Sequence, residues 1–369
     1  MTKAVFSGYY GMKNSGDDAF VEASAWGSKK FWKSTEQLFF AKELPETLTS
    51  TTHYFAHKNY INFASAIKDI SFSDIFVSAG GSTFHSSLKK TDLRTYAKLK
   101  KTLGIKGKTG AIGISLGPFI NTNAEKNTID YLKTLDFLAL RDNKSYELAK
   151  SYNLPYNPVK AFDLAALLPE IYNFDLKKTK KVNEYAVVGI SICNYETYTN
   201  GNLDNEKRRN EFIENLILSL KTNYKIKFRF FIFNGNKTLG DEKLTNTIIE
   251  RVNSDKKLNY EVIPYQPNVK STFNLIASCD VVVSTRLHAS IFACYSNTPF
   301  FLLEYHRKCT DFLLDIGQSE KYRVLDGEVD VKQVALEIEN IISNKNYLIP
   351  SYLEQTIERA KLNFTETIK

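Results

Sequence analysis

Residues 281–304 read VVVSTRLHASIFACYSNTPFFLLE and predict a strand, a helix and a second strand. Residues 281–284 form a short β-branched run, 287–296 have the length and composition of a helix, and 299–304 are again apolar. This order is typical of a βαβ unit, whose two strands run parallel in one sheet. The segment therefore predicts a parallel sheet with strands that end at Ser284 and Glu304.

The same alternation extends through the chain in both directions. Further strands are predicted at residues 3–9, 38–40, 74–78, 109–115, 137–141, 185–192, 227–233 and 260–263, with amphipathic helical stretches between them. The Lys-rich segment 173–184 interrupts the rhythm. We expect an N-terminal Rossmann-like domain at 1–172, a linker at 173–184 and a C-terminal Rossmann-like domain at 185–345. Residues 346–369 are expected to form a terminal helix that packs back on the N-terminal domain.

Two such domains predict an α/β fold of the GT-B-like kind. In that arrangement two parallel sheets face a central cleft, and ligands lie beyond the carboxyl ends of the strands. The composition agrees with a globular protein, since 43% of the 369 residues are hydrophobic and 24% are charged.

Several classes of site are excluded by the sequence patterns. The four cysteines form no CxxC pair, and HExxH and DxD motifs are absent, so neither a metal nor a bound cofactor is expected. The basic residues lack the aromatic interleaving of a nucleic-acid surface, so no nucleic-acid partner is expected.

The charge and the lack of long apolar runs bear on location and partners. No apolar stretch of about 18 residues occurs and the first residues do not resemble a signal peptide, which predicts a cytoplasmic protein. The net charge of +8 favours anionic partners, including the inner face of a cell membrane, where a peripheral contact is expected.

A glycine-containing loop, GYYGMKNSGDD at residues 8–18, lies between the first strand and the first helix. Asn14 and Gly16 lie where a ligand can approach the backbone closely. Asp17 or Asp18 can cap the helix, or one of them can accept a proton from a sugar hydroxyl.

A second glycine-containing segment, SAGGSTFH at residues 78–85, follows the third predicted strand. It predicts a tight turn from strand to helix. Gly80 and Gly81 then either allow a ligand close to the backbone or serve the turn alone.

Two charged residues of the N-terminal half are candidates for the cleft. Arg141 follows a short strand, where its planar guanidinium suits a carboxylate or phosphate, and a surface ion pair is the alternative. Asp163 is flanked by apolar residues, so it either pairs with an arginine or acts as a base, and both interpretations place it near Arg141.

The segment STRLHA at residues 284–289 gives the sharpest prediction. Arg286 and His288 open a helix, and Lys308 follows the next strand. Because neighbouring parallel strands end at the same edge, these three side chains should converge on an anion of more than one charge.

Taken together, GYYGMKNSGDDA, SAGGSTF, GISLGPF, LALRDNKSYELAK, FDLAALL and the segment from STRLHA to LLDIG resemble the polysaccharide pyruvyltransferases. The resemblance implies a GT-B-like enzyme that uses phosphoenolpyruvate (PEP) to place a pyruvate ketal on a sugar, commonly across O4 and O6. It implies that PEP binds through Arg141, Arg286, Leu287, His288 and Lys308. The expected acceptor is a surface-polysaccharide intermediate linked to undecaprenyl diphosphate, with galactose favoured. This acceptor is expected to contact Asn14, Gly16, Asp18, Gly80 and Gly81.

In the predicted reaction, His288 is the general acid and Asp17 or Asp163 is the base for the acceptor hydroxyl. A histidine titrates near neutral pH and can therefore move a proton in either direction. No metal is required, since the side chains supply the positive charge. Two alternatives stay open: a GT-B glycosyltransferase that uses a nucleotide sugar, and an inactive relative that binds a glycan or a partner.

Overall fold

The computed structural model describes residues 2–176, 184–221 and 225–368, and the chain divides into two compact units. The first unit consists of Met1–Met12, Asp17–Ile171 and Glu354–Lys369. The second consists of Lys13–Gly16 and Tyr172–Leu353. Most of the predicted linker, residues 177–183, lies outside the described residues.

The first unit is built on a seven-stranded parallel sheet with the order β3-β2-β1-β4-β5-β6-β7. Its strands are β1 (Lys3–Ser7), β2 (Glu36–Phe40), β3 (Thr52–Tyr54), β4 (Ile75–Phe84), β5 (Lys108–Leu116), β6 (Phe137–Leu140) and β7 (Val159–Lys160). Its helices are α1 (Ser15–Phe31), α2 (Tyr60–Phe72), α3 (Leu93–Thr102), α4 (Thr122–Leu132), α5 (Asn143–Lys150), the 3₁₀ turn η1 (Leu164–Leu167), α6 (Leu168–Tyr172) and α14 (Leu353–Thr365). The order reverses between β1 and β4, which is the Rossmann topology.

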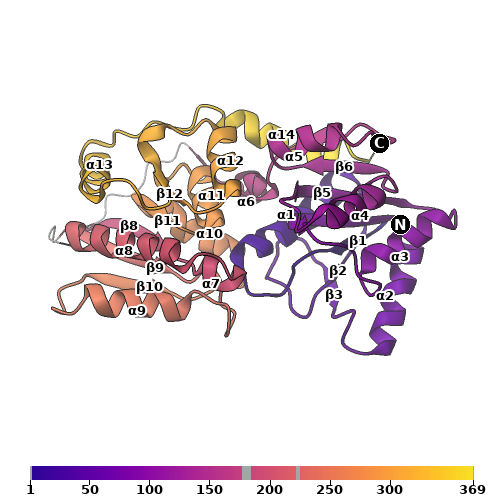
Figure 1. The fold of residues 1–369 in the computed structure, drawn as a ribbon, viewed down its shortest axis with the longest axis horizontal. Coiled ribbons are helices and arrows are strands. Elements are labelled where there is room, and N and C mark those ends of the chain that lie inside the picture. Colours follow the sequence, from indigo (N-terminus) through magenta and orange to yellow (C-terminus); the bar gives the residue numbers. More distant parts are fainter. Residues whose placement is uncertain (1, 177–183, 222–224, 369) are drawn as a thin grey trace. The chain divides into compact units, whose positions relative to one another are not determined.

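The last helix returns to this unit from the far end of the chain. In Figure 1, α14 is yellow and α5 is purple, and an Nη2 atom of Arg359 on α14 lies 3.3 Å from Oδ1 of Asn143 on α5. The indole Nε1 of Trp32 donates to the carbonyl of Phe364 at 3.0 Å, and the Phe364 ring packs 5.2 Å from the Trp32 ring. Burial of such aromatic rings ties the carboxyl terminus to the core formed by α1 and the sheet.

The second unit repeats the topology with six parallel strands in the order β10-β9-β8-β11-β12-β13. The strands are β8 (Ala186–Ser191), β9 (Ile226–Phe231), β10 (Tyr260–Ile263), β11 (Val281–Ser284), β12 (Phe300–Glu304) and β13 (Arg323–Leu325). The helices are α7 (Tyr195–Thr199), α8 (Leu203–Leu220), α9 (Glu242–Val252), α10 (Val269–Ala277), α11 (Leu287–Tyr295), α12 (Arg307–Ile316), the 3₁₀ turn η2 (Glu320–Tyr322) and α13 (Val331–Asn344). β11 and β12 pair in parallel, as residues 281–304 predict.

Apolar strands and capped helices explain why these segments fold as they do. Every residue of β11 and β12 is buried, as expected for strands of a parallel sheet covered on both faces. Many helices begin after a side chain that accepts a hydrogen bond from a free N–H of the first turn. Such caps are Asn59, Asp92, Asn121, Asp142, Asn202, Asn268 and Asp330.

The predicted domain boundaries need correction at two short segments. Lys13–Gly16 was expected in the N-terminal domain but belongs to the second unit, because its backbone binds residues 233–235. Residues 346–353 were expected with the terminal helix, but they also belong to the second unit. There the N–H of Tyr352 donates to the carbonyl of Ile316 at 2.9 Å.

Two boundaries of elements that carry predicted site residues differ from the prediction by four residues or more. Helix α1 begins at Ser15, four residues earlier than expected, so Asp17 and Asp18 lie inside its first turn. β4 was expected to end at Ser78 but continues to Phe84 through Gly80 and Gly81. Both glycines have positive φ, +76° and +78°, and the pairing with β5 shifts register between Gly81 and Phe84. The pair therefore forms an irregularity within the strand instead of a turn after it.

Among the described residues, no helix is both long enough and apolar enough to cross a membrane.

Candidate functional site

The carboxyl edge of the second sheet gathers most of the predicted donor-site residues. The strand order reverses between β8 and β11, and in open parallel sheets ligands bind at such a reversal. The loops after these strands are joined: the N–H of Cys193 donates to Oγ1 of Thr285 at 2.8 Å, and the N–H of Thr285 donates to the carbonyl of Ser191 at 2.8 Å. The loop that carries Arg286 and leads into α11 is thus held against the neighbouring loop.

Arg286 forms an ion pair with Asp241, a residue that the sequence analysis did not single out. Nε of Arg286 lies 3.1 Å from both carboxylate oxygens of Asp241, and Nη2 binds the same carboxylate. Asp241 has a fully buried side chain and also accepts from the N–H of Asn234 at 2.9 Å. Burial raises the pKa of Asp241, and the Arg286 charge opposes that rise. The carboxylate fixes the direction of the guanidinium.

Lys308 lies beside a pair of tyrosine rings. Its Nζ is 5.5 Å from the ring centroid of Tyr195 and 5.4 Å from that of Tyr305, and the two rings are 4.6 Å apart. The faces of aromatic rings attract a cation within about 6 Å. The N–H of Lys308 also donates to Nδ1 of His306 at 3.1 Å, so both ends of the residue are positioned.

Arg286 and Lys308 follow neighbouring strands of the sheet. β11 and β12 pair in parallel, Arg286 precedes α11 and Lys308 lies in the first turn of α12, so both residues are at the carboxyl edge. Burial raises the pKa of the Cys193 thiol, and the charges of Arg286 and Lys308 both oppose that rise. The convergence of Arg286, His288 and Lys308 on an anion stays a prediction.

His288 lies against a segment from the start of the chain. A β-carbon built on Gly16 would overlap the imidazole ring of His288. Two backbone hydrogen bonds fix the segment within the second unit: Ser15 N–H to the Phe233 carbonyl at 2.9 Å and Gly235 N–H to the Lys13 carbonyl at 2.8 Å. Together they form an antiparallel bridge between Asn14 and Asn234. The side chain of Asn14 accepts from the N–H of Gly16 at 3.1 Å.

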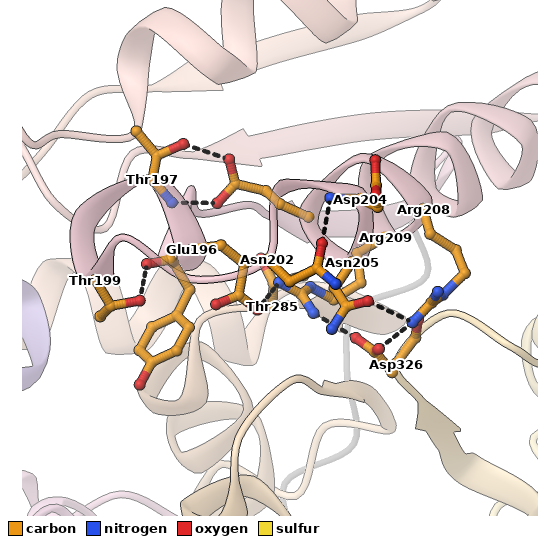
Figure 2. Close-up of polar contacts among 12 residues, drawn as sticks. Glu196, Thr197, Thr199, Asn202, Asp204, Asn205, Arg208, Arg209, Thr285 and Asp326 are labelled. Atoms are coloured by element: carbon orange, nitrogen blue, oxygen red, sulfur yellow. Dashed lines mark hydrogen bonds and ion pairs between the residues drawn. The ribbon is translucent and has the colours of Figure 1, made fainter.

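A network of charged groups holds α7, which carries Tyr195 and Tyr198 (Figure 2). Buried Arg209 donates to Oε1 of Glu196 at 2.6 Å and also binds Asp326. On the other side of α7, Thr197 donates to Glu206 through its N–H and its hydroxyl, at 3.1 and 2.6 Å. The Tyr198 ring lies 6.0 Å from the Arg286 guanidinium carbon, so α7 presents one ring to each cation.

The first unit carries the other predicted arginine. Arg141 follows β6, and Nη1 lies 3.1 Å from Oδ2 of Asp163 in a buried ion pair. Its Nε donates to Ser115 Oγ at 2.7 Å, and Nη2 donates to Ser82 Oγ at 3.3 Å. Of the two interpretations of Asp163, the structure shows the ion pair. The same carboxylate also caps η1 by accepting from the N–H of Ala165 at 3.0 Å.

The structure gives other roles to some of the glycines and aspartates that were singled out near the start of the chain. A side chain at Gly80 would overlap the Phe20 ring, so close packing explains this glycine, whereas a β-carbon at Gly81 would meet only Phe20 at 3.9 Å. Asn14 lies just before the first residue of α1 and binds the N–H of Gly16. The capping role considered for Asp17 and Asp18 therefore falls to Asn14.

A polar pocket of about 410 Å³ opens at the carboxyl edge of the first sheet, where its own strand order reverses. It is lined mainly by hydroxyl, imidazole and charged side chains. The lining residues are Ser7, Gly8, Tyr9, His57, Ser78, Thr83, Ser86, Ser87, Lys89, Thr91, Asp92, Leu93 and Arg94.

Comparison with known families identifies the kind of protein. The family described as polysaccharide pyruvyl transferase matches residues 14–307, which include the edge of the second sheet up to Arg307. The chain belongs to this family. Membership implies an enzyme with PEP as donor and a polysaccharide as acceptor. No curated protein matches the chain.

Solved structures support the GT-B-like fold. MnaA of S. aureus, solved with UDP, aligns over 100% of this chain and 93% of its own with a TM-score of 0.59 and 10% identity. The UDP-GlcNAc 2-epimerase of Methanocaldococcus jannaschii aligns over 98% of both chains with a TM-score of 0.60 and 13% identity. The lipopolysaccharide outer core galactosyltransferase WaaB covers 100% and 99%, with a TM-score of 0.51 and 11% identity. At these identities the likeness concerns the fold alone, and it confirms the two Rossmann-like domains of the prediction.

Proposed function

We propose that this pyruvyl transferase moves pyruvate from PEP to a hexose of a surface-polysaccharide intermediate, as a cyclic 4,6-ketal, and releases phosphate. The observation that carries the proposal is the position of Arg286, His288 and Lys308 directly after the paired strands β11 and β12, at one edge of the second sheet. PEP has a phosphate and a carboxylate, so it needs two separate cationic partners. Charge-assisted hydrogen bonds of this kind contribute roughly 1.5–3 kcal/mol each.

In this proposal the cations have different tasks. Arg286, oriented by Asp241, presents a planar pair of N–H groups that suits a carboxylate or phosphate. Lys308, which lies beside Tyr195 and Tyr305, acts as a point charge. Arg141 is the proposed third cationic ligand of PEP, and Leu287 supplies an apolar contact.

The chemistry requires a proton at the PEP methylene carbon and two hydroxyl attacks at C2. His288 is the proposed proton donor to the methylene, which becomes the methyl group of the ketal. One acceptor hydroxyl bonds to C2 and gives up its proton. The bond from C2 to the phosphate oxygen then breaks, and phosphate leaves with the electron pair and takes up the first hydroxyl's proton. The second hydroxyl bonds to C2, closes the ring and gives its proton to the His288 imidazole, which restores the acid. Asp17 is the proposed base, because Asp163 is already engaged by Arg141.

For the acceptor, we propose the polar pocket of the first unit. Its hydroxyls can exchange hydrogen bonds with a sugar, and Tyr9, which is 54% exposed, offers a ring face. The proposed acceptor is a hexose, with galactose favoured, on undecaprenyl diphosphate. The proposed location is the cytoplasmic face of the membrane that holds this lipid.

Ligand-induced stabilisation tests the donor. The melting temperature is measured with PEP, with UDP, with UDP-GlcNAc and with buffer alone. A ligand that binds only the folded state adds about 2.7 kcal/mol of stability at a hundred times its Kd. We expect PEP to raise Tm, and Arg286→Ala to abolish the rise.

Arg251→Ala is the matched control, because Arg251 is an exposed arginine of the same unit. It should keep the PEP response. A rise in Tm with UDP or UDP-GlcNAc and none with PEP would overturn the proposal and indicate an enzyme that uses a nucleotide sugar. Release of phosphate on addition of a galactoside acceptor then tests the transfer itself.

A further inference from the structure

Helix α2 carries the three most exposed large apolar side chains among the described residues. Tyr60, Phe72 and Ile61 are 94%, 77% and 76% exposed. Single exposed apolar residues are normal on a protein surface, but several on one short helix mark an interaction site.

The outward side of α2 is a stripe of apolar residues with one lysine among them. Ala66 and Ile70 are its buried residues and pack on the sheet. Tyr60, Ala64, Lys68 and Phe72 are all exposed and recur every four residues, so they share one side of the helix. Lys68 is the charged member of that stripe. The neighbouring Asp69 is directed elsewhere, since it binds Nζ of Lys3 at 2.9 Å and the hydroxyl of Tyr54 at 2.6 Å.

The end of α3 extends this stripe. Both helices pack on the same buried cluster, and Nζ of Lys100 on α3 reaches the carbonyl of Ser73, directly after Phe72 (Figure 1). Near this junction Leu99, Leu103 and Ile105 are 50%, 65% and 40% exposed. We name these three residues, with Tyr60, Ile61 and Phe72, the α2–α3 face.

The charge around the α2–α3 face is basic. Residues 93–108 contain six lysines and arginines and no carboxylate. Two of the six are bound by carboxylates from outside the segment, Arg94 by Asp92 and Lys101 by Asp136, and Lys100 is buried. The other basic side chains on or beside the face are Lys58, Lys68, Lys98, Lys106 and Lys108.

We infer that the α2–α3 face binds the surface of an anionic lipid bilayer. Apolar side chains interspersed with lysines are the composition of interfacial helices, whose apolar residues enter the headgroup boundary while the ammonium groups meet lipid phosphates. A second copy of the chain fits less well, because two such faces would bring lysines of like charge together. The inference rests on the proposed function in one respect: a lipid-linked acceptor lies in the same membrane.

Sedimentation with vesicles tests the docking surface without PEP or acceptor. The full chain is mixed with vesicles of phosphatidylcholine alone or of phosphatidylcholine with phosphatidylglycerol. We expect binding to the anionic vesicles, weakened by salt because exposed charges are screened. Tyr60→Ser/Ile61→Ser/Phe72→Ser should lower the partition coefficient at least about tenfold. Lys98→Gln and Lys106→Gln should each lower it about fivefold.

A matched control replaces exposed leucines of the second unit. Leu325, Leu336 and Leu348 are 57%, 59% and 56% exposed, and their serine variants should bind like wild type. The inference is overturned if wild type ignores anionic vesicles or if the triple serine variant still binds them. It is also overturned if the face proves to join two copies, so that this variant converts a dimer to a monomer. The PEP-induced rise in Tm is measured on the same variant, which separates failure of docking from failure of the donor assignment.

Discussion

The two sheets share a strand order, and each carries one buried arginine–aspartate pair after its strands. In the first unit Arg141 binds Asp163, with 7% and 5% of the two side chains exposed. In the second unit Arg286 binds Asp241, with 17% and 0% exposed. The surroundings of the two arginines differ. Arg141 also donates N–H groups to two serine hydroxyls. Arg286 instead lies beside the Tyr198 ring, and its charge, like that of Lys308, acts to lower the pKa of the Cys193 thiol.

The shared feature is the arginine–aspartate pair at the sheet edge, and the differing feature is the set of residues around each arginine. In both units a buried carboxylate fixes an arginine at the end of a parallel sheet. In the second unit, His288 follows that arginine in the first turn of α11, and Lys308 lies in the first turn of α12. We therefore expect the proton transfer in the second unit, and the following predictions test that expectation.

Replacement of His288 should have the largest effect. If His288 donates the proton to PEP, His288→Ala lowers kcat by roughly 10²–10⁴-fold and leaves the PEP-induced rise in Tm in place. Phosphate release measures kcat. The control is His53→Ala, an exposed histidine on β3 of the first unit, which should have wild-type kcat. A near-normal rate for His288→Ala would break the assignment of chemistry to the second unit.

The contact between Gly16 and His288 should give the next largest effect. In Gly16→Ala the new methyl group displaces the imidazole ring, and a misplacement of about 1 Å can cost on the order of 10²-fold in rate. The control is Ser15→Ala, because the buried Ser15 hydroxyl makes no hydrogen bond among the described residues. If Gly16→Ala lowers Tm sharply and leaves kcat unchanged, the glycine serves packing and not the position of His288.

The sequence predicted the alternation of strands and helices well, because buried parallel strands and capped helices are local signals. The strands at 260–263 and 281–284 have the predicted bounds. β4 was misjudged because a glycine pair normally ends a strand, and only its pairing with β5 shows that the strand continues. Lys13–Gly16 was assigned to the wrong unit because its partners, residues 233–235, are more than 200 positions away in the chain.

The candidate site was predictable where cations follow strands. Arg286, His288 and Lys308 could be named from position alone. Asp241 could not, since it follows β9 only after a loop and nothing in its neighbourhood distinguishes it from a helix-capping aspartate. Tyr195 and Tyr198 belong to α7, a helix of five residues, which is too short to give a periodic pattern.

The two aspartates test whether both arginines bind PEP. Asp241→Asn and Asp163→Asn each remove the charge that orients an arginine, and breaking a buried pair costs about 3–5 kcal/mol of stability. We expect each variant to raise KM for PEP roughly 10- to 100-fold while kcat changes less. Initial rates of phosphate release at varied PEP give both constants, and urea unfolding gives the stability.

The outcomes of this pair sharpen the comparison. An increase in KM with Asp241→Asn alone would limit the donor site to the second unit and make the Arg141–Asp163 pair structural. Asp69→Asn is a control in the first unit, because Asp69 forms an ion pair with Lys3 away from both arginines. Rescue of KM by Asp241→Glu would show that the carboxylate acts by positioning Arg286.

The smallest effect is expected for the ion pairs that hold α14 to the first unit. Glu170 binds Lys30 of α1 and Lys361 of α14. Burial alone raises the pKa of Glu170, but the hydrogen bonds from the two lysines lower it overall. A lowered pKa in the folded state means that the stabilisation is present above the ordinary pKa of glutamate and is lost as the pH falls through the folded value.

Glu170→Gln should therefore lower the free energy of unfolding by at most about 1 kcal/mol at pH 7, because the groups are partly exposed, and should leave it unchanged in strong acid. Urea unfolding at pH 7 and at about pH 2 measures both values, with Glu147→Gln on the exposed face of α5 as control. An equal cost at both pH values would show that Glu170 stabilises the unit by packing and not by charge.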